Sequence, residues 1–167
     1  QRPMGIRDSI DGKAFGFATM SGRLKVECKE DLFEMNFPSW QPKEVQVTEQ
    51  MVEALGVKPL QAFLTRDLIL LLSSEKEVAQ LEPDFAKLAT FPDGLLTIIT
   101  ARSDTYDFVS RSFAPKLKIY EDPVTGSAHS SLIPYWSREL GKKEMTARQL
   151  SKRGGTLHCK DCGERVK

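Results

Sequence analysis

Hydrophobic and polar residues alternate near the start of the chain. The apolar members of two such runs are Leu24, Val26 and Cys28, then Phe33, Met35 and Phe37. A period of two is typical of strands that place one face on a core. Together with the apolar run 15–19, the turn at Ser21-Gly22, the charged turn over 29–31 and the stop at Pro38, it predicts an antiparallel meander of three strands with one face on a core.

Further along, capping residues and apolar faces indicate helices. Thr48 can cap a helix that Gly56 is placed to end. A serine at 73 or 74 and Gly141 suggest similar boundaries elsewhere. The predicted helices span 48–55, 74–81, 84–88 and 127–140.

Apolar runs between these helices predict further strands. These strands span 62–65, 68–72, 95–100 and 106–112, and a final hairpin joins 156–159 to 165–167. The run 68–72 is apolar throughout, so we expect it to be buried on both faces. Because strands do not alternate strictly with helices, the pattern favours an α+β fold over a doubly wound parallel sheet.

Composition narrows the classes of partner. Hydrophobic residues make up 40% of the chain, enough for a sizeable core. The 24 basic residues nearly balance 23 acidic ones, which argues against binding nucleic acid or an anionic membrane through bulk charge. No apolar run is long enough to span a bilayer. Three cysteines, an odd and low number, are typical of a reduced protein, so we expect a cytoplasmic location.

The two ends of the chain suggest a longer reading frame. The sequence opens at Gln1 without a methionine and closes at 165–167 in what resembles the start of a strand. We expect both ends to be cut from a longer chain.

The segment 121–129, Glu-Asp-Pro-Val-Thr-Gly-Ser-Ala-His, carries the groups best suited to chemistry. Pro123 favours an extended Asp122, and Gly126 permits a tight bend or a close ligand just before a predicted helix. The free N–H groups of that helix and the Ser127 hydroxyl suit an anion such as a substrate carboxylate. Asp122 alongside could exchange a proton or hold an amine or hydroxyl. A structural alternative stays open, in which Ser127 is only an N-cap and Asp122 only a turn residue.

The same segment resembles the second signature of the phenazine-biosynthesis PhzF-like isomerase family. The likeness continues through Leu132, Pro134-Tyr135-Trp136 and Leu140-Gly141-Lys142, and extends to 19–24, 35–38, 107–115 and 147–155. It runs from about residue 15 to the end of the chain and is densest over 107–155.

This resemblance implies an α+β fold similar to diaminopimelate epimerase and proline racemase. Two domains there each wrap a mostly antiparallel sheet around a central helix, with the active site between them. The helix over 127–140 would be the central helix of a second domain spanning 15–167 and truncated at its carboxyl end. Residues 1–14 would be a linker or a remnant of the first domain.

The family's reaction moves a proton on a cyclic hydroxy-amino acid, an isomerisation without metal or organic cofactor. The resemblance therefore implies a small-molecule carboxylate substrate, with neither nucleic acid nor membrane as partner, and a cytoplasmic homodimer.

Carried onto this chain, the motif makes Asp122 the active-site aspartate and Gly126 and Ser127 the contacts of the substrate carboxylate. Ala128 adjoins them and would offer its backbone amide. His129 belongs to the motif as a substrate-binding candidate, although a packing or capping role is favoured for it over catalysis.

Two first-domain features of the family are missing from this sequence: its acid–base glutamate and its Gly-His-Ala-Thr motif. Glu121 is a poor substitute because it alternates to the other side of a strand from Asp122. We therefore expect the chain to hold half of a catalytic site and, alone, to bind weakly and catalyse little. The alternative is a non-catalytic binding or interaction protein that keeps the fold.

The cysteines offer a weaker pattern. Cys159 and Cys162 resemble one half of a zinc ribbon, but a closed zinc site needs four ligands and only Cys28 remains. A hairpin turn is the favoured interpretation, and no metal is expected. The core or an interface is the expected place of three aromatic residues, Trp40, Tyr135 and Trp136.

Overall fold

The computed structural model describes residues 14–19, 22–29 and 32–167 of the chain. The turns expected at Ser21-Gly22 and over 29–31, and nearly all of the expected linker 1–14, fall outside the described residues or extend beyond them. Within the described part, no helix has the length and apolar character needed to cross a lipid bilayer.

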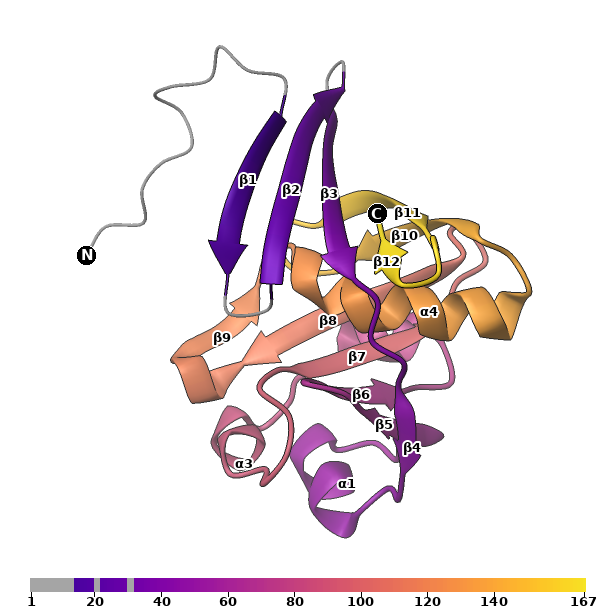
Figure 1. Ribbon diagram of the computed structural model, residues 1–167. Helices are drawn as coiled ribbons and strands as arrows, with labels where there is room; N and C mark the ends of the chain where they lie inside the picture. Colours follow the sequence, from indigo (N-terminus) through magenta and orange to yellow (C-terminus); the bar gives the residue numbers. More distant parts are fainter. Residues whose placement is uncertain (1–13, 20–21, 30–31) are drawn as a thin grey trace.

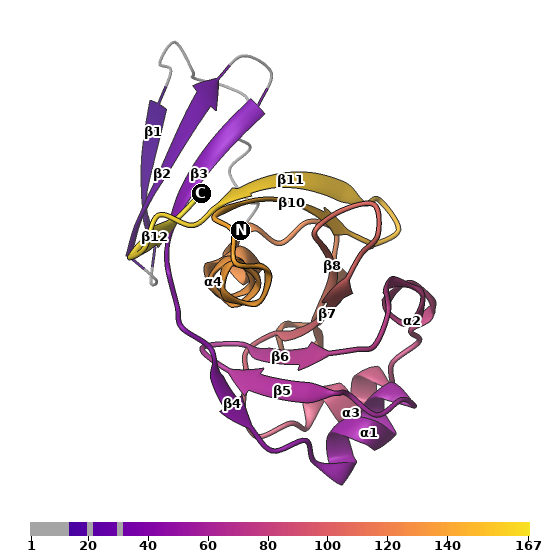
Figure 2. The same cartoon turned by 90° about the vertical axis from the view of Figure 1, so that its right-hand side faces the viewer.

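A large mixed sheet curves around the helix α4 (His129–Leu140), which Figure 2 shows end-on. The sheet runs, in spatial order, through β11 (Gly155–Lys160), β10 (Glu144–Gln149), β8 (Phe108–Ala114), β7 (Thr97–Arg102), β6 (Leu68–Leu71), β5 (Gln61–Leu64) and β4 (Lys43–Val45), and β9 (Ile119–Asp122) pairs with β8. The pairs β6–β7 and β8–β10 are parallel and the other pairs in this sheet are antiparallel. The expected α+β fold with a central helix is confirmed, and the sheet is mixed, with two parallel pairs among pairs that are mostly antiparallel, as expected.

A smaller sheet stands beside it and includes the expected meander (Figure 1). The strands β1 (Ala14–Thr19), β2 (Gly22–Lys29) and β3 (Leu32–Pro38) pair antiparallel in succession. The last strand, β12 (Arg165–Val166), pairs with the end of β3. Val166 bridges Asp161, so the chain turns back here, but residues 156–159 of the expected final hairpin pair with β10 and not with 165–167. Near its end the meander meets the core: Phe37 packs against buried residues, whereas Phe33 is 63% exposed.

The helices begin and end where the local chemistry indicated. Thr48 caps α1 (Glu49–Leu55) and Gly56 ends it at φ 68°, in the left-handed region that favours glycine. Ser74 caps α2 (Glu75–Gln80) and Asp84 caps α3 (Phe85–Ala89) through their side-chain oxygens. Two short 3-10 turns complete the set, η1 (Pro115–Leu117) and η2 (Gly126–Ala128), so the helix expected to begin at 127 opens as a 3-10 turn.

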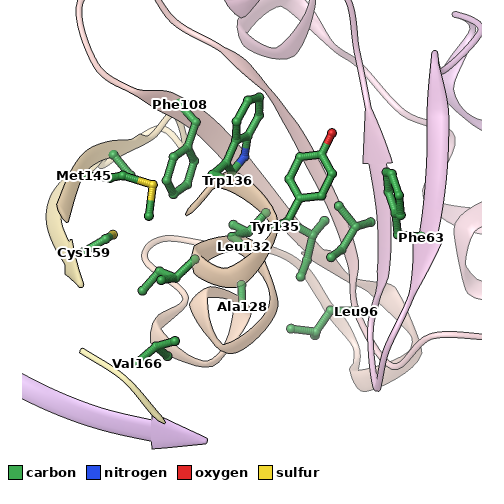
Figure 3. Close-up of a cluster of buried hydrophobic side chains, with 14 of the residues drawn as sticks. Phe63, Leu96, Phe108, Ala128, Leu132, Tyr135, Trp136, Met145, Cys159 and Val166 are labelled. Atoms are coloured by element: carbon green, nitrogen blue, oxygen red, sulfur yellow. The ribbon is translucent and has the colours of Figure 1, made fainter. Parts of the chain in front are cut away.

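The large sheet separates two hydrophobic clusters. Its concave face packs on α4, where the rings of Phe108 and Trp136 stack at 5.5 Å with Met145 nearby (Figure 3). Its other face packs on α1, α2 and α3. The run 68–72 confirms the expectation of burial on both faces, because Ile69 belongs to the first cluster and Leu70 to the second.

Side-chain hydrogen bonds shift two strand boundaries from their expected positions. The strand expected over 106–112 begins at Phe108, because the Ser103 hydroxyl accepts the N–H groups of Thr105 and Tyr106 and holds them in a turn. The strand expected over 95–100 begins at Thr97, because the preceding Leu96 donates its N–H to the Asp67 carboxylate. The strands β4 and β10 were not expected from the sequence, whereas the strand expected to carry Glu121 and Asp122 is β9.

Candidate active site

Asp122 lies at the end of β9, where the chain leaves the sheet for the first turn of α4. The strand places it opposite Ser112 of β8, and its side chain is half-buried. Among the described residues, no hydrogen bond or ion pair involves its carboxylate. An unengaged carboxylate at the edge of a loop is free to contact a ligand.

Gln149, at the end of β10, fixes the loop that follows Asp122. Its amide nitrogen donates to the Asp122 carbonyl at 2.7 Å, and its amide oxygen accepts the Thr125 N–H at 2.7 Å. The side chain is fully buried, and Ser151 adds a hydrogen bond to the Pro123 carbonyl. The conformation of this loop is therefore fixed by β10, a strand that no local pattern in the sequence links to it.

Gly126 permits a close approach of this loop to β3. A Cβ placed on it would lie 3.0 Å from the ring of Phe37 and 3.4 Å from the methyl group of Met35. The close approach expected at this glycine therefore occurs against protein side chains. It also places Gly126 on the wall of a groove.

That groove has a volume of about 630 Å³ and runs alongside α4 between β3 and β11. Gly126, Val124 and His129 line it near the start of the helix, and Met35 and Leu157 line it from the two sheets. Lys142 and Glu144 add charged side chains to its lining. Gly126 and His129 thus share one cavity, whereas Asp122, Ser127 and Ala128 do not line it.

Ser127 faces a different set of residues, on the β5–β6 side of the helix. The Arg66 guanidinium donates to its Oγ at 3.2 Å. Neither η2 nor α4 has a side-chain cap hydrogen bond, so the structural alternative in which Ser127 serves only as N-cap is wrong. The first N–H groups of such a helix have no intrahelical acceptor and remain suited to an anion.

Ala128 and His129 both point into the protein. The Ala128 side chain is fully buried in the cluster around α4. The Nδ1 of His129 lies 3.0 Å from the Thr125 carbonyl, which can only accept, so Nδ1 carries the proton and Nε2 a lone pair. Nε2 is buried and has no partner among the described residues. Burial lowers the pKa of His129 to about 4, against the opposing effect of the Thr125 hydrogen bond.

Glu121 is engaged in the sheet. Both of its carboxylate oxygens accept hydrogen bonds from Arg111, at 2.7 and 3.0 Å. The same guanidinium also donates to the carbonyls of Val78 and Leu81. Glu121 therefore links β9 to α2 through Arg111, and its carboxylate is not free to contact a ligand.

The cysteines of the last hairpin differ in environment. Cys159 is buried, and burial raises the pKa of its thiol to about 12, while Cys162 is exposed. Within the described residues, no group of three or more His, Cys, Asp or Glu side chains is arranged to hold a metal ion.

Arg66, Asp67 and Gln149 were not predicted from the sequence, in which residues 66–67 only separate the expected strands 62–65 and 68–72. One signal was available for the first two. A charged pair directly before a run expected to be buried on both faces indicates a carboxylate or guanidinium that must be paired in the interior. Gln149 gave no such signal.

The comparisons with known proteins agree on one family. A model of the phenazine biosynthesis-like protein family, PhzC-PhzF, matches residues 5–166. A Pseudomonas aeruginosa protein named an uncharacterized isomerase is 46% identical over 157 residues, which cover 93% of this chain and 59% of that protein. A mouse protein named phenazine biosynthesis-like domain-containing protein 2 is 38% identical over 160 residues, covering 84% of this chain and 56% of its own length.

The fold is also that of a solved member. The crystal structure of a PhzF family protein from Enterococcus faecalis has a TM-score of 0.88 to this chain at 42% identity, covering 95% of this chain and 61% of that one. The chain thus spans between 56% and 61% of the length of these three relatives. On the family model, the identities and the shared fold, the chain belongs to the phenazine biosynthesis-like (PhzF) family, which includes proteins named isomerases.

Proposed function

We propose that this chain supplies one half of the active site of a PhzF-like isomerase acting on a small cyclic or amino-acid-like carboxylate. The substrate carboxylate binds at the start of α4, through the N–H groups of Gly126, Ser127 and Ala128 and the Ser127 hydroxyl. Asp122 is the acid–base group that this chain contributes, and no cofactor takes part.

The observation that carries the proposal is the Asp122 carboxylate. It is half-buried, it has no partner among the described residues, and Gln149 fixes the loop that joins it to α4. The neighbouring Glu121 is paired with Arg111, so only one of the two adjacent acids is free. The name of the P. aeruginosa relative, an isomerase, supports the same class of reaction.

The proposed chemistry conserves the atoms of the substrate. As a carboxylate, Asp122 accepts a proton from one position of the substrate; as a carboxylic acid, it returns a proton to another. The positive end of α4 stabilises negative charge on the substrate during this transfer. A second acid–base group, which the family resemblance assigns to the missing glutamate, completes the site.

A second function is favoured by one observation. Residues 1–167 contain no Gly-His-Ala-Thr motif, and the alternative is a binding protein that retains the fold without chemistry. In that case the start of α4 still binds a carboxylate, but no proton exchange follows.

The test is the substitution Asp122→Asn in a protein of the relatives' full length that contains this chain. The variant removes the titratable group with little change in volume, so we expect turnover to fall by about 10²- to 10⁴-fold. The measurement is the exchange of substrate C–H protons with deuterium in D₂O, followed by NMR over a panel of cyclic hydroxy-amino acids.

Glu121→Gln is the matched control, because it removes the adjacent carboxylate. We expect it to lower stability, since Arg111 loses its partner, but to leave exchange per folded molecule unchanged. Equal exchange rates for Asp122→Asn and the unsubstituted protein would contradict the role of Asp122. Carboxylate binding without any exchange would favour the binding protein.

A further inference from the structure

The turn between β5 and β6 contacts the first turns of α4. The Thr65 and Ser131 hydroxyls lie 2.8 Å apart, and Arg66 reaches Ser127 as described above. The sequence separation between Arg66 and Ser127 is 61 residues. A cation is thus held beside the hydroxyl to which the proposed function assigns the substrate carboxylate.

Asp67 fixes this guanidinium in one orientation. Its carboxylate is fully buried and accepts two hydrogen bonds from Arg66, at 3.1 Å from Nε and 2.6 Å from Nη2. It also accepts the Leu96 N–H at 3.2 Å. A buried carboxylate needs a charged partner, so the forked pair holds the Arg66 plane.

Trp40 supports the guanidinium from the side. The Arg66 guanidinium carbon lies 4.8 Å from the centre of the Trp40 ring, a cation–π distance. Trp40 is itself anchored on α4, because its backbone N–H donates to the Ser130 carbonyl at 2.8 Å. That carbonyl is available because Pro134, four residues on, has no N–H to donate to it.

These contacts determine what the Ser127 hydroxyl can do. A hydroxyl has one proton to donate and two lone pairs, whereas a guanidinium only donates. The Arg66 hydrogen bond therefore occupies a lone pair of Oγ and leaves the hydroxyl proton for another acceptor. The Arg66 side chain is 30% exposed, so this corner is open to a ligand.

We propose that Arg66, held by Asp67 and Trp40, is a positioning residue that orients the Ser127 hydroxyl to donate to the substrate carboxylate. The proposal rests on the proposed function, since it assigns a role within the same carboxylate site. The ligand that this site would bind is a small organic carboxylate. The site would bind the uncharged amide of the same shape less tightly.

The experiment is an NMR titration of the 167-residue protein with benzoate and, separately, with benzamide. Arg66→Gln alone would leave Asp67 buried without a partner, so the main variant is the double substitution Arg66→Gln/Asp67→Asn. It replaces the ion pair by a neutral hydrogen-bonding pair at constant net charge. Each titration is repeated in the Ser127→Ala background, which gives a double-mutant cycle.

We expect the neutral pair to weaken benzoate binding by about tenfold when Ser127 is present and by less than about twofold in Ser127→Ala. The carbonyl oxygen of benzamide accepts a weaker hydrogen bond than a carboxylate does, so benzamide should lose less affinity and the benzoate-to-benzamide affinity ratio should fall. Arg66→Lys, which keeps the charge without the fork, should recover part of the ratio. Arg138→Gln is the control, since Arg138 lies over Tyr135 at the other end of the same helix.

The possible failures are distinct. Equal weakening in both Ser127 backgrounds, or an unchanged benzoate-to-benzamide ratio, overturns the positioning role and leaves the carboxylate site in place. If the unsubstituted protein binds benzoate no better than benzamide, the proposed carboxylate site is refuted, and the proposed role of Arg66 is refuted with it. Where Ser127→Ala binds too weakly to fit, an unchanged benzoate-to-benzamide ratio in the Ser127 background still overturns the role.

Discussion

At the scale of single residues, the start of α4 holds an imidazole whose burial sets its protonation. Only 3% of His129 is exposed, and its Nδ1 proton is donated to the Thr125 carbonyl. Burial lowers its pKa from 6.5 to about 4, so the folded protein keeps the ring neutral at physiological pH. Its contacts are those of a packed, hydrogen-bonded side chain in the first turn of the helix.

The depressed pKa of His129 predicts how stability changes with pH. Between pH 6.5 and 4 the unfolded chain binds a proton at this residue and the folded chain does not, so acid favours unfolding. The stabilisation that comes from keeping His129 neutral is complete above pH 6.5. As the pH falls toward 4, the free energy of unfolding should decrease by about 3 kcal/mol. Urea unfolding at several pH values measures it.

His129→Gln should remove this part of the pH dependence, while His158→Gln, at an exposed position on β11, should retain it. The same decrease in stability between pH 6.5 and 4 in the unsubstituted protein and in both variants would rule out His129 as its source.

At the scale of elements, a helix-breaking residue lies inside the longest helix and has a use there. Pro134 leaves the Ser130 carbonyl without its intrahelical donor, and Trp40, on the segment between β3 and β4, donates its N–H instead. The helix and the segment are joined at the position where the ladder is interrupted. This junction also fixes the position of Trp40, whose ring contacts the Arg66 guanidinium.

Pro134→Ala should therefore weaken the junction. The new N–H competes for the Ser130 carbonyl, so we expect hydrogen exchange of the Trp40 amide to become about tenfold faster or more, while the amides of α4 gain protection. Exchange followed by NMR measures both. Pro115→Ala, at the first position of η1, is the control and should leave Trp40 unaffected. Unchanged exchange at Trp40 in Pro134→Ala would show that the junction does not depend on the proline.

At the scale of the whole molecule, the same strands serve both hydrophobic clusters. Neighbouring residues in β6, β7 and β8 point to opposite faces, as Phe108 and Val109 do. Neither cluster can therefore lose its sheet without exposing the other. The groove beside α4 lies where the two sheets meet, and exposed apolar residues such as Leu32 and Phe33 line it.

This shared sheet predicts a single unfolding transition. Leu132→Ala, in the cluster around α4, and Leu88→Ala, in the cluster around α3, should each lower the free energy of unfolding by about 2–5 kcal/mol, because both side chains are fully buried. Near-UV and far-UV circular dichroism should give coincident urea transitions for both variants. Leu117→Ala, at a position 48% exposed, should change stability by less than about 0.5 kcal/mol. Separate transitions in either core variant would contradict the shared sheet.

Much of the fold and the motif could be predicted from the sequence because the signals are local. Caps at Thr48, Ser74 and Asp84 act within four residues, and the apolar run 68–72 indicates its own burial. The motif over 121–129 is contiguous, so it identified the family by itself.

What only the tertiary structure decided depends on residues far apart in the chain. Gln149 is 27 residues from Asp122, and Arg66 is 61 from Ser127, so no periodicity within one element connects either pair. The parallel pairings β6–β7 and β8–β10 likewise join strands that only the folded sheet brings together. Local capping therefore set where the helices α1, α2 and α3 begin, and long-range packing set which side chains surround the start of α4.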